Sequence, residues 1–253
     1  MDLIEIAVPD GTAEAYAARP ASGHGPGVLL FMDAIGLRPE IARIADRIAS
    51  WGYVVLAPNV FYREGTAAEI APKTDLHDPG ARDAHFRIVG PMIARLTSDM
   101  AVADNAAYVA ALRGIDGVDD GPIGVSGYCM GARLAVRAAG RHPEDVAAVG
   151  GFHGGRLVTD DADSPHRELA GSRAAYVFGH ADNDGSMPPE AVEALGVALT
   201  EAGLEHANAI YPGSPHGYTM SDTSMYDETG AERHFTELRA LLSRSLGSGS
   251  PSR

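Results

Sequence analysis

The sequence has one cysteine in 253 residues, which excludes an internal disulfide. Basic residues are also scarce: 20 Lys and Arg stand against 34 Asp and Glu, and the formal net charge is −14. This acidic balance repels phosphate backbones and anionic membranes, so nucleic acid and membrane surfaces are poor partners. No basic segment followed by a long apolar run opens the sequence, so neither secretion nor a membrane span is indicated. We therefore expect a cytoplasmic protein, a monomer or weak homo-oligomer, that acts on a small molecule.

Metal and nucleotide signatures are missing as well. The cysteine has no second thiol, and the histidines are too scattered to form a metal-binding spacing (His77, His85, His142, His153 and His180). The glycines do not form a dinucleotide-binding fingerprint (Gly36, Gly151, Gly154 and Gly155). The sequence thus predicts no metal and no cofactor.

The composition is that of one globular domain. Hydrophobic residues make up 45% of the sequence and charged residues 21%, which argues against wholesale disorder. A single α/β domain often reaches about 200–250 residues, so we expect one domain over residues 1–246. Residues 247–253 are rich in Gly and Ser and are predicted to be a flexible C-terminal tail.

Alternating and continuous apolar segments predict the secondary structure. Residues 3–8 and 12–20 are expected to form an N-terminal hairpin. The continuous apolar run at 27–32 is typical of a buried parallel strand, and a helical spacing at 39–51 leads to a strand at 53–57. Further along, we expect helices at 97–112, 189–202 and 231–246 and strands at 146–151, 174–179 and 206–211. The fold class is therefore α/β.

Between residues 58 and 90 this pattern dissolves into a polar stretch interrupted by Gly and Pro. The stretch is too long for a simple connection between two elements. We predict a functional excursion over the site that takes part in substrate selection.

The segment Gly127-Tyr128-Cys129-Met130-Gly131 lies between a predicted strand and a predicted helix. This order is that of a nucleophile elbow, with cysteine in place of the commoner serine. Side chains at Gly127 and Gly131 would collide with the adjoining strand and helix. The positive end of the helix that begins near Met130 favours a thiolate at Cys129. The motif predicts a nucleophile, although a small buried cysteine is also compatible with it.

Other polar residues follow predicted strands, and ligands of parallel α/β sheets collect at these strand ends. Asp182 and Asp184 follow one strand, His216 follows another and Asp33 a third. The order nucleophile, acid, base is the one that α/β-hydrolases use, because a histidine moves the proton and an acid orients the histidine. The spacing alone leaves open whether Asp182 or Asp184 is the acid.

Together, these residues make the sequence resemble the dienelactone hydrolase family. The resemblance rests on the Gly-Tyr-Cys-Met-Gly elbow, the acid before Ile35-Gly36, the late Asp and the Pro215-His216-Gly217 loop, and it spans residues 3–246. It implies an α/β-hydrolase fold, with a central, mostly parallel sheet flanked by helices. It also implies a cofactor-free hydrolase of small esters or lactones.

The resemblance implies a catalytic triad of Cys129, Asp184 and His216. Asp184 is preferred to Asp182 because the order Ala-Asp-Asn-Asp at 181–184 is similar to the family's Ala-Glu-Asn-Asp form. In this interpretation Cys129 attacks the carbonyl, His216 moves the proton and Asp184 orients His216.

The resemblance also assigns the surroundings of the nucleophile. The backbone N–H groups of Ala34 and Met130 would form the oxyanion hole. Asp33 stands where the family has a glutamate that contacts the thiol and helps to ionise it. Tyr128, next to the nucleophile, is expected to form a wall of the cleft, and His153 is a further candidate for the pocket lining.

Family members that open dienelactones hold the substrate carboxylate with arginines, one of them four residues after the catalytic histidine. That position is Met220 here, so we expect neutral short-chain esters or lactones to be favoured. Arg82 or Arg87 in the segment 58–90 would restore such a clamp. His85 in the same segment is a weaker candidate for contact with an anionic substrate.

Two alternative functions stay open on these residues. A thioesterase or an acyltransferase would use the same triad. A non-catalytic small-molecule-binding protein or a redox-sensing thiol protein is the alternative from another class, because a fold does not dictate a function. Measuring ester turnover before and after alkylation of Cys129 distinguishes an enzyme from a binding protein or a redox-sensing protein.

Overall fold

The computed structural model describes residues 1–247 and places eight strands in one sheet. The predicted C-terminal tail, apart from Gly247, lies outside the described residues. The strands are β1 (Leu3–Val8), β2 (Gly11–Ala18), β3 (Gly27–Phe31), β4 (Val54–Pro58), β5 (Ile123–Tyr128), β6 (Val146–Phe152), β7 (Ala175–His180) and β8 (His206–Ile210). Their order in the sheet is β1-β2-β4-β3-β5-β6-β7-β8. Strands β1 and β2 form an antiparallel hairpin, and β2 also pairs with β4 in antiparallel orientation. From β4 onward in this order, every pair of neighbouring strands is parallel.

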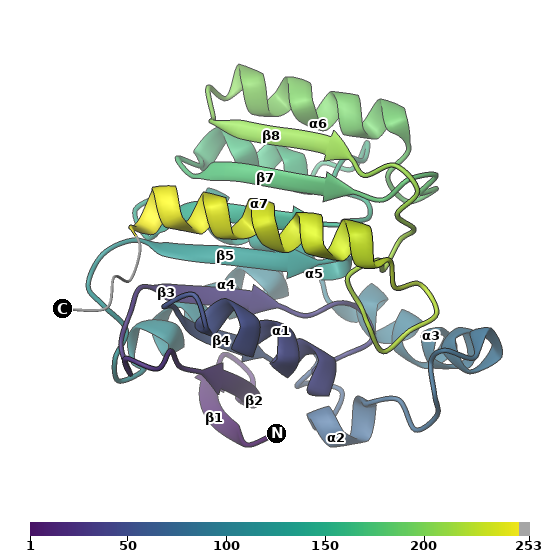
Figure 1. Cartoon of the computed structure of the whole chain (residues 1–253), viewed down its shortest axis with the longest axis horizontal. Coiled ribbons are helices and arrows are strands. Elements are labelled where there is room, and N and C mark those ends of the chain that lie inside the picture. Colours follow the sequence, from purple (N-terminus) through teal and green to yellow (C-terminus); the bar gives the residue numbers. More distant parts are fainter. Residues whose placement is uncertain (248–253) are drawn as a thin grey trace.

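Helices cover both faces of the sheet. They are α1 (Pro39–Ala49), α2 (Ala67–Ile70), α3 (Pro79–Arg95), α4 (Ser98–Arg113), α5 (Met130–Arg141), α6 (Pro189–Glu201) and α7 (Glu228–Leu246), with a 3-10 helix, η1, at Pro165–Gly171. Helices α1 and α7 lie on one face, and α4 and α5 lie on the other (Figure 1). This is the layered arrangement that the alternation of strands and helices predicted.

The apolar runs of the sequence form the centre of the sheet. Every residue of β3, β4 and β5 is buried, as expected for parallel strands with helices on both sides. The amphipathic α1 buries Ile41, Ile44 and Ile48 against the sheet. The sequence therefore specifies the core through continuous strands and one-sided helices.

The segment 58–90 forms helices that the sequence did not predict. It contains the short α2 and most of α3, a helix of 17 residues that begins after Asp78, whose side chain accepts a hydrogen bond from the Gly80 N–H. Only His85 and Val89 of α3 are buried, so the helix lacks the apolar stripe by which a helix is recognised in a sequence. Its prolines and glycines also resemble loop signals.

Helix α3 lies beside the carboxyl ends of the parallel strands. In Figure 1 the arrowheads of β5, β7 and β8 point to the side of the molecule where α3 is found. The excursion therefore covers the strand ends at which a ligand is expected.

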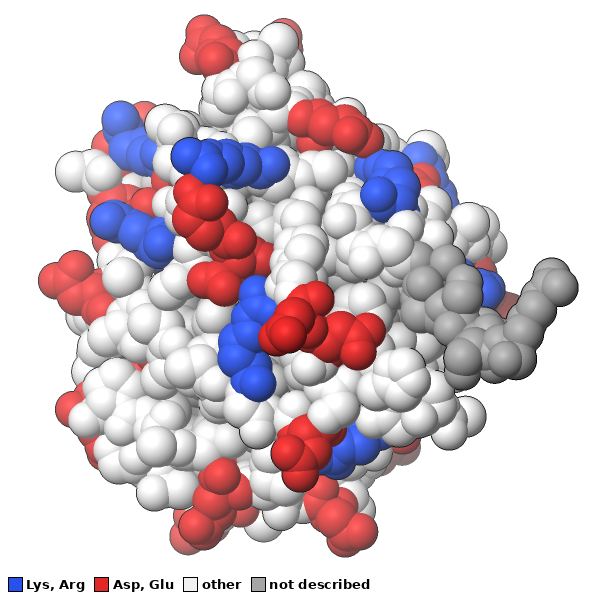
Figure 2. Space-filling model, turned by 90° about the vertical axis from the view of Figure 1, so that its left-hand side faces the viewer, with Lys and Arg blue, Asp and Glu red and all other residues white. Residues whose placement is uncertain are grey.

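On the opposite side of the molecule, at the amino ends of the strands, acidic and basic side chains are mixed (Figure 2). Acidic side chains are scattered over it with basic side chains between them (Figure 2). The described part of this face therefore has no broad basic patch of the kind that nucleic acid binding requires. Separately, none of the helices within residues 1–247 has the length and apolar character needed to cross a membrane.

The turn from β5 into α5 generates a prediction about stability. A Cβ atom at Gly131 would lie 2.5 Å from the carbonyl oxygen of Met32, so the Gly131→Ala variant must push α5 away from the end of β3. We expect the free energy of unfolding to fall by about 1–3 kcal/mol, measured by urea denaturation. Gly114→Ala at the end of α4 is the matched control, because its backbone is right-handed helical and a Cβ there meets no atom of residues 1–247 closer than 3.5 Å. The control should be neutral or stabilising, and equal losses in both variants would contradict the close-packing explanation.

Candidate active site

Cys129 occupies the sharp turn between β5 and α5. Its backbone has φ 52° and ψ −112°, a left-handed conformation that is unusual for a residue with a side chain. A Cβ at Gly127 would lie 2.1 Å from the carbonyl oxygen of Gly131, so the predicted clash at the elbow is present. The N–H of Cys129 donates a 3.0 Å hydrogen bond to the carbonyl of Phe152 at the end of β6. The strain is therefore held in place by the adjoining helix and strand.

His216 and Asp184 meet beside this turn from the loops after β8 and β7. The Nδ1 of His216 lies 2.6 Å from Oδ2 of Asp184. The N–H and the hydroxyl of Ser186 both donate to Oδ1 of Asp184, at 2.8 and 2.7 Å. Burial would raise the pKa of Asp184, but the contacts with His216 and Ser186 outweigh it and lower the pKa to about 2. Asp184 is thus a fixed carboxylate at neutral pH.

Asp182, the other candidate acid, has a different position. Its Oδ2 accepts a 2.9 Å hydrogen bond from the N–H of Gly213, and its own N–H donates to the carbonyl of Ser214 at 2.7 Å. Asp182 therefore braces the loop that leads to His216. This geometry favours Asp184 as the residue that orients the histidine.

The charge state of His216 depends on Cys129. Burial of the imidazole lowers its pKa, but the negative charge of Cys129 and the hydrogen bonds to Asp184 and Cys129 outweigh this effect and raise the pKa to about 10. His216 is therefore an imidazolium at neutral pH. Because its Nδ1–H donates to Asp184, Nε2 is the ring nitrogen left for Cys129. Nε2 of His216 is thus the atom that is placed to exchange a proton with the thiol.

Two backbone N–H groups near the elbow have no acceptor among residues 1–247. Met130 is the first residue of α5, so its N–H has no partner within the helix. The N–H of Ala34, after β3, likewise has no acceptor among residues 1–247. Both residues are almost completely buried. Their free N–H groups are compatible with an oxyanion hole at these positions, which stays a prediction.

Asp33 has partners that the sequence did not reveal. Its Oδ1 lies 2.6 Å from Nη1 of Arg38 and accepts a 3.0 Å hydrogen bond from the N–H of Ile35, and Oδ2 lies 3.2 Å from Nη2 of Arg38. Arg38 also binds Asp222, with 2.6 Å between Nε and Oδ2. Asp33 lines the same pocket as Cys129, but its carboxylate is bound by arginine. The expected contact with the thiol is therefore not formed in this structure.

The positions of Tyr128 and His153 are also informative. Tyr128 is fully buried, and its hydroxyl lies 3.0 Å from Nε2 of His234, so it packs beneath the elbow and does not form the expected wall of the cleft. His153 does line the pocket: its Nε2 lies 2.7 Å from the Thr219 hydroxyl, and its ring centre lies 5.3 Å from that of His216. Burial, together with the charges of His216 and His234, lowers the pKa of His153 well below 6.5. His153 is thus a neutral neighbour of His216.

Helix α3 forms part of the pocket over Cys129. Arg82 and Phe86 line it, with the Arg82 guanidinium 4.9 Å from the centre of the Phe86 ring. Arg87 is exposed and does not line it, and the buried His85 has its Nε2 3.0 Å from the carbonyl oxygen of Ile35. Of the three candidates from this segment, only Arg82 reaches the site.

The remaining lining is largely apolar. Met220, as expected, and Met225 lie in the loop after His216 and contribute thioether side chains. The space is small, about 20 Å³, so it accepts little more than the reacting group of a substrate. Within residues 1–247, no three His, Cys, Asp or Glu side chains come together as metal ligands would.

Comparison with known proteins extends this description. A model of the dienelactone hydrolase family matches residues 13–246. A protein of Salmonella typhi named "putative carboxymethylenebutenolidase" is 28% identical over 224 residues, 86% of this chain and 77% of the relative. The carboxymethylenebutenolidase of Pseudomonas sp. (strain P51) is 30% identical over 129 residues, 51% of this chain and 50% of that protein.

A solved structure shows the same architecture. The crystal structure of a "putative dienelactone hydrolase" from Klebsiella pneumoniae has a TM-score of 0.81 at 21% sequence identity, and the match covers 96% of this chain and 98% of that one. This likeness confirms the fold that the sequence predicted. Because the family model spans nearly the whole sheet and the elbow, the chain belongs to the dienelactone hydrolase family and is a hydrolase with the α/β-hydrolase fold.

Proposed function

We propose that this protein is a cysteine-dependent hydrolase of small esters or lactones, with Cys129, His216 and Asp184 as its catalytic residues. The observation that carries this proposal is the single chain of contacts in which Asp184 holds His216 and His216 interacts with the strained Cys129. The name carboxymethylenebutenolidase, given to relatives, agrees with carboxylic ester hydrolysis.

The acylation step follows from the thiolate–imidazolium pair. The sulfur of Cys129 attacks the carbonyl carbon and forms a carbon–sulfur bond. The proton on Nε2 of His216 passes to the leaving oxygen as the carbon–oxygen bond breaks, so an alcohol or the ring-opened hydroxyl leaves. The N–H groups of Ala34 and Met130 stabilise the negative oxygen of the tetrahedral intermediate.

The deacylation step uses the same histidine in its other state. Once the thiol is acylated, Cys129 carries no negative charge, and the main interaction that raised the pKa of His216 is lost. The neutral imidazole then takes a proton from water, which attacks the thioester and releases the acid. Asp184 keeps the ring in the orientation that both steps need. No metal or cofactor is required by these steps.

The proposed catalytic thiol also indicates a cellular compartment. A catalytic cysteine must stay reduced, so we place the enzyme in the cytoplasm, where thiols are kept reduced.

The first prediction concerns the nucleophile. Cys129→Ala should abolish turnover of p-nitrophenyl acetate, and Cys129→Ser should retain a small fraction, because an alcohol is not pre-ionised by His216. Alkylation of the wild-type thiol should have the same effect as the alanine variant. Turnover that survives alkylation would reject Cys129 as the nucleophile and favour a binding or redox role.

The second prediction separates the two aspartates. Asp184→Asn should lower kcat by several orders of magnitude, of order 10⁴ in a triad, because the imidazole loses its orienting carboxylate. Asp182→Asn is the matched control and should have a much smaller effect, since Asp182 contacts only backbone groups of the loop. The reverse ranking in steady-state kinetics would transfer the role to Asp182.

The third prediction concerns pH. The raised pKa of His216, about 10 against 6.5, means that its stabilising contribution is complete below pH 6.5 and is lost as the pH rises through 10. The lowered pKa of Asp184, about 2 against 3.8, means that its contribution is complete above pH 3.8 and is lost as the pH falls through 2.

The free energy of unfolding of wild type minus that of His216→Gln should therefore be largest between about pH 4 and 6.5 and should fall on either side. Chemical denaturation at a series of pH values measures this difference. A difference that does not change with pH would mean that the two groups are not coupled in the folded protein.

A further inference from the structure

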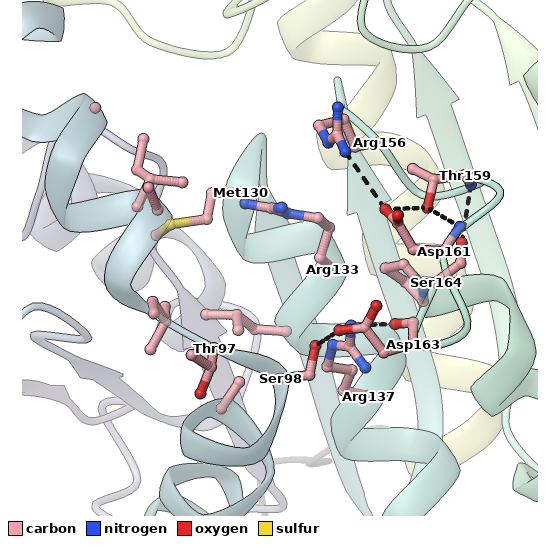
Figure 3. Close-up of a pocket in the computed structure, with 17 residues that line it drawn as sticks. Thr97, Ser98, Met130, Arg133, Arg137, Arg156, Thr159, Asp161, Asp163 and Ser164 are labelled. Carbon is pink, nitrogen blue, oxygen red and sulfur yellow. Dashed lines mark hydrogen bonds and ion pairs between the residues drawn. The ribbon is translucent and has the colours of Figure 1, made fainter.

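A second and larger hollow lies beside the pocket over Cys129. It is a groove of about 580 Å³ between α3, the start of α4, helix α5 and the loop after β6 (Figure 3). Its lining includes Met130, Arg133 and Arg137 of α5 and Arg156 of the loop. A volume of this size is typical of a site for a whole small molecule.

The groove lies next to the proposed active site, although the two spaces share no lining residue within residues 1–247. Met130, on its wall, directly follows Cys129. Arg156 follows Gly155, where a Cβ atom would lie 3.7 Å from Cε1 of His216. Helix α3 lines both spaces, the small pocket through Phe86 and the groove through its last turns. The groove is thus within reach of a substrate that is bound at Cys129 and is too large for 20 Å³.

Among the arginines of the groove, Arg133 is the one without a partner. Arg156 lies 3.5 Å from Asp161, and Arg137 lies 3.5 Å from Glu168. Arg133 forms no hydrogen bond or ion pair with any residue from 1 to 247. In Figure 3 its side chain extends from α5 into the open space near Met130, and no dashed line reaches it.

The two acids of the groove do not compensate for Arg133. Asp161 binds Arg156 and the hydroxyl of Thr159, and Asp163 accepts a hydrogen bond from Ser98. Burial lowers the pKa of Arg133, the charge of Cys129 raises it, and the charges of Arg156 and Arg137 lower it further. Apart from Cys129, no group among residues 1–247 offsets the desolvation of Arg133, so this partly buried cation gains from an anion in the groove.

We propose that Arg133 binds a carboxylate at the far end of an extended ester or lactone substrate, whose carbonyl lies at Cys129 and whose remainder fills the groove. This inference rests on the proposed function and specifies its substrate class. Arg133 lies four residues after Cys129, about 6 Å along the helix axis, so a carboxylate a few carbon atoms from the scissile carbonyl reaches it. The preference for neutral substrates expected from Met220 did not take this arginine into account.

The test compares two esters that differ only in charge: p-nitrophenyl hemiglutarate, which has a free carboxylate, and its neutral methyl ester. Arg133→Gln should lower kcat/KM for the hemiglutarate by about 10- to 100-fold and leave the neutral ester within about 3-fold. Arg133→Lys should recover part of the loss, because it restores the charge without the planar fork. The matched control is Arg141→Gln on the same helix, which lies outside the groove and should change neither value.

The neutral ester serves as an internal check on folding and chemistry in every variant. An equal loss for both esters, or no loss for either, would overturn the proposal. It would also be overturned if Arg82→Gln removed the response to the carboxylate while Arg133→Gln did not. Should the wild type hydrolyse neither ester, the proposed function fails instead. Calorimetric binding of glutarate to wild type and to Arg133→Gln then tests the anion site alone, with loss of binding in the variant expected.

Discussion

The close approach of α5 to the end of β3 is the constraint on which the site depends. Gly131 packs so tightly against the carbonyl oxygens of Phe31 and Met32 that no side chain fits between them. This contact lies two residues after Cys129, whose backbone is left-handed, and it involves Met32, which is two residues before Ala34. The proposed nucleophile and the proposed oxyanion donors thus lie beside a backbone contact that side-chain motion does not disturb.

Charge then distinguishes the groups around the thiol. His216 and Arg133 both interact electrostatically with Cys129, but they differ in what they can do. In the proposed mechanism His216 exchanges its proton, because the charge of Cys129 raises its pKa and its ring is held by Asp184. Arg133 keeps its proton throughout and offers a fixed charge. One cation therefore suits the chemistry, and the other suits recognition of a substrate.

Much of this could be predicted from the sequence, because local patterns encode it. Continuous apolar runs specified the central strands. The glycines of the elbow and the polar residues after the strands indicated Cys129, His216 and an acid at 182 or 184. Other features depend on tertiary contacts. The pairing of Asp33 with Arg38 and Asp222 joins distant segments, and α3 buries too few side chains to show a helical period. The missing partner of Arg133 can be seen only once its neighbours are placed.

The central claim is that an acyl group passes through the sulfur of Cys129. Rapid quenching of the wild-type protein with p-nitrophenyl acetate, followed by digestion and mass spectrometry, tests it most directly. The proposed mechanism predicts an acetyl group on the peptide that contains Cys129, formed within the first turnover and lost on further incubation. Acetylation of another residue at the rate of turnover, with the Cys129 peptide unmodified, would contradict it.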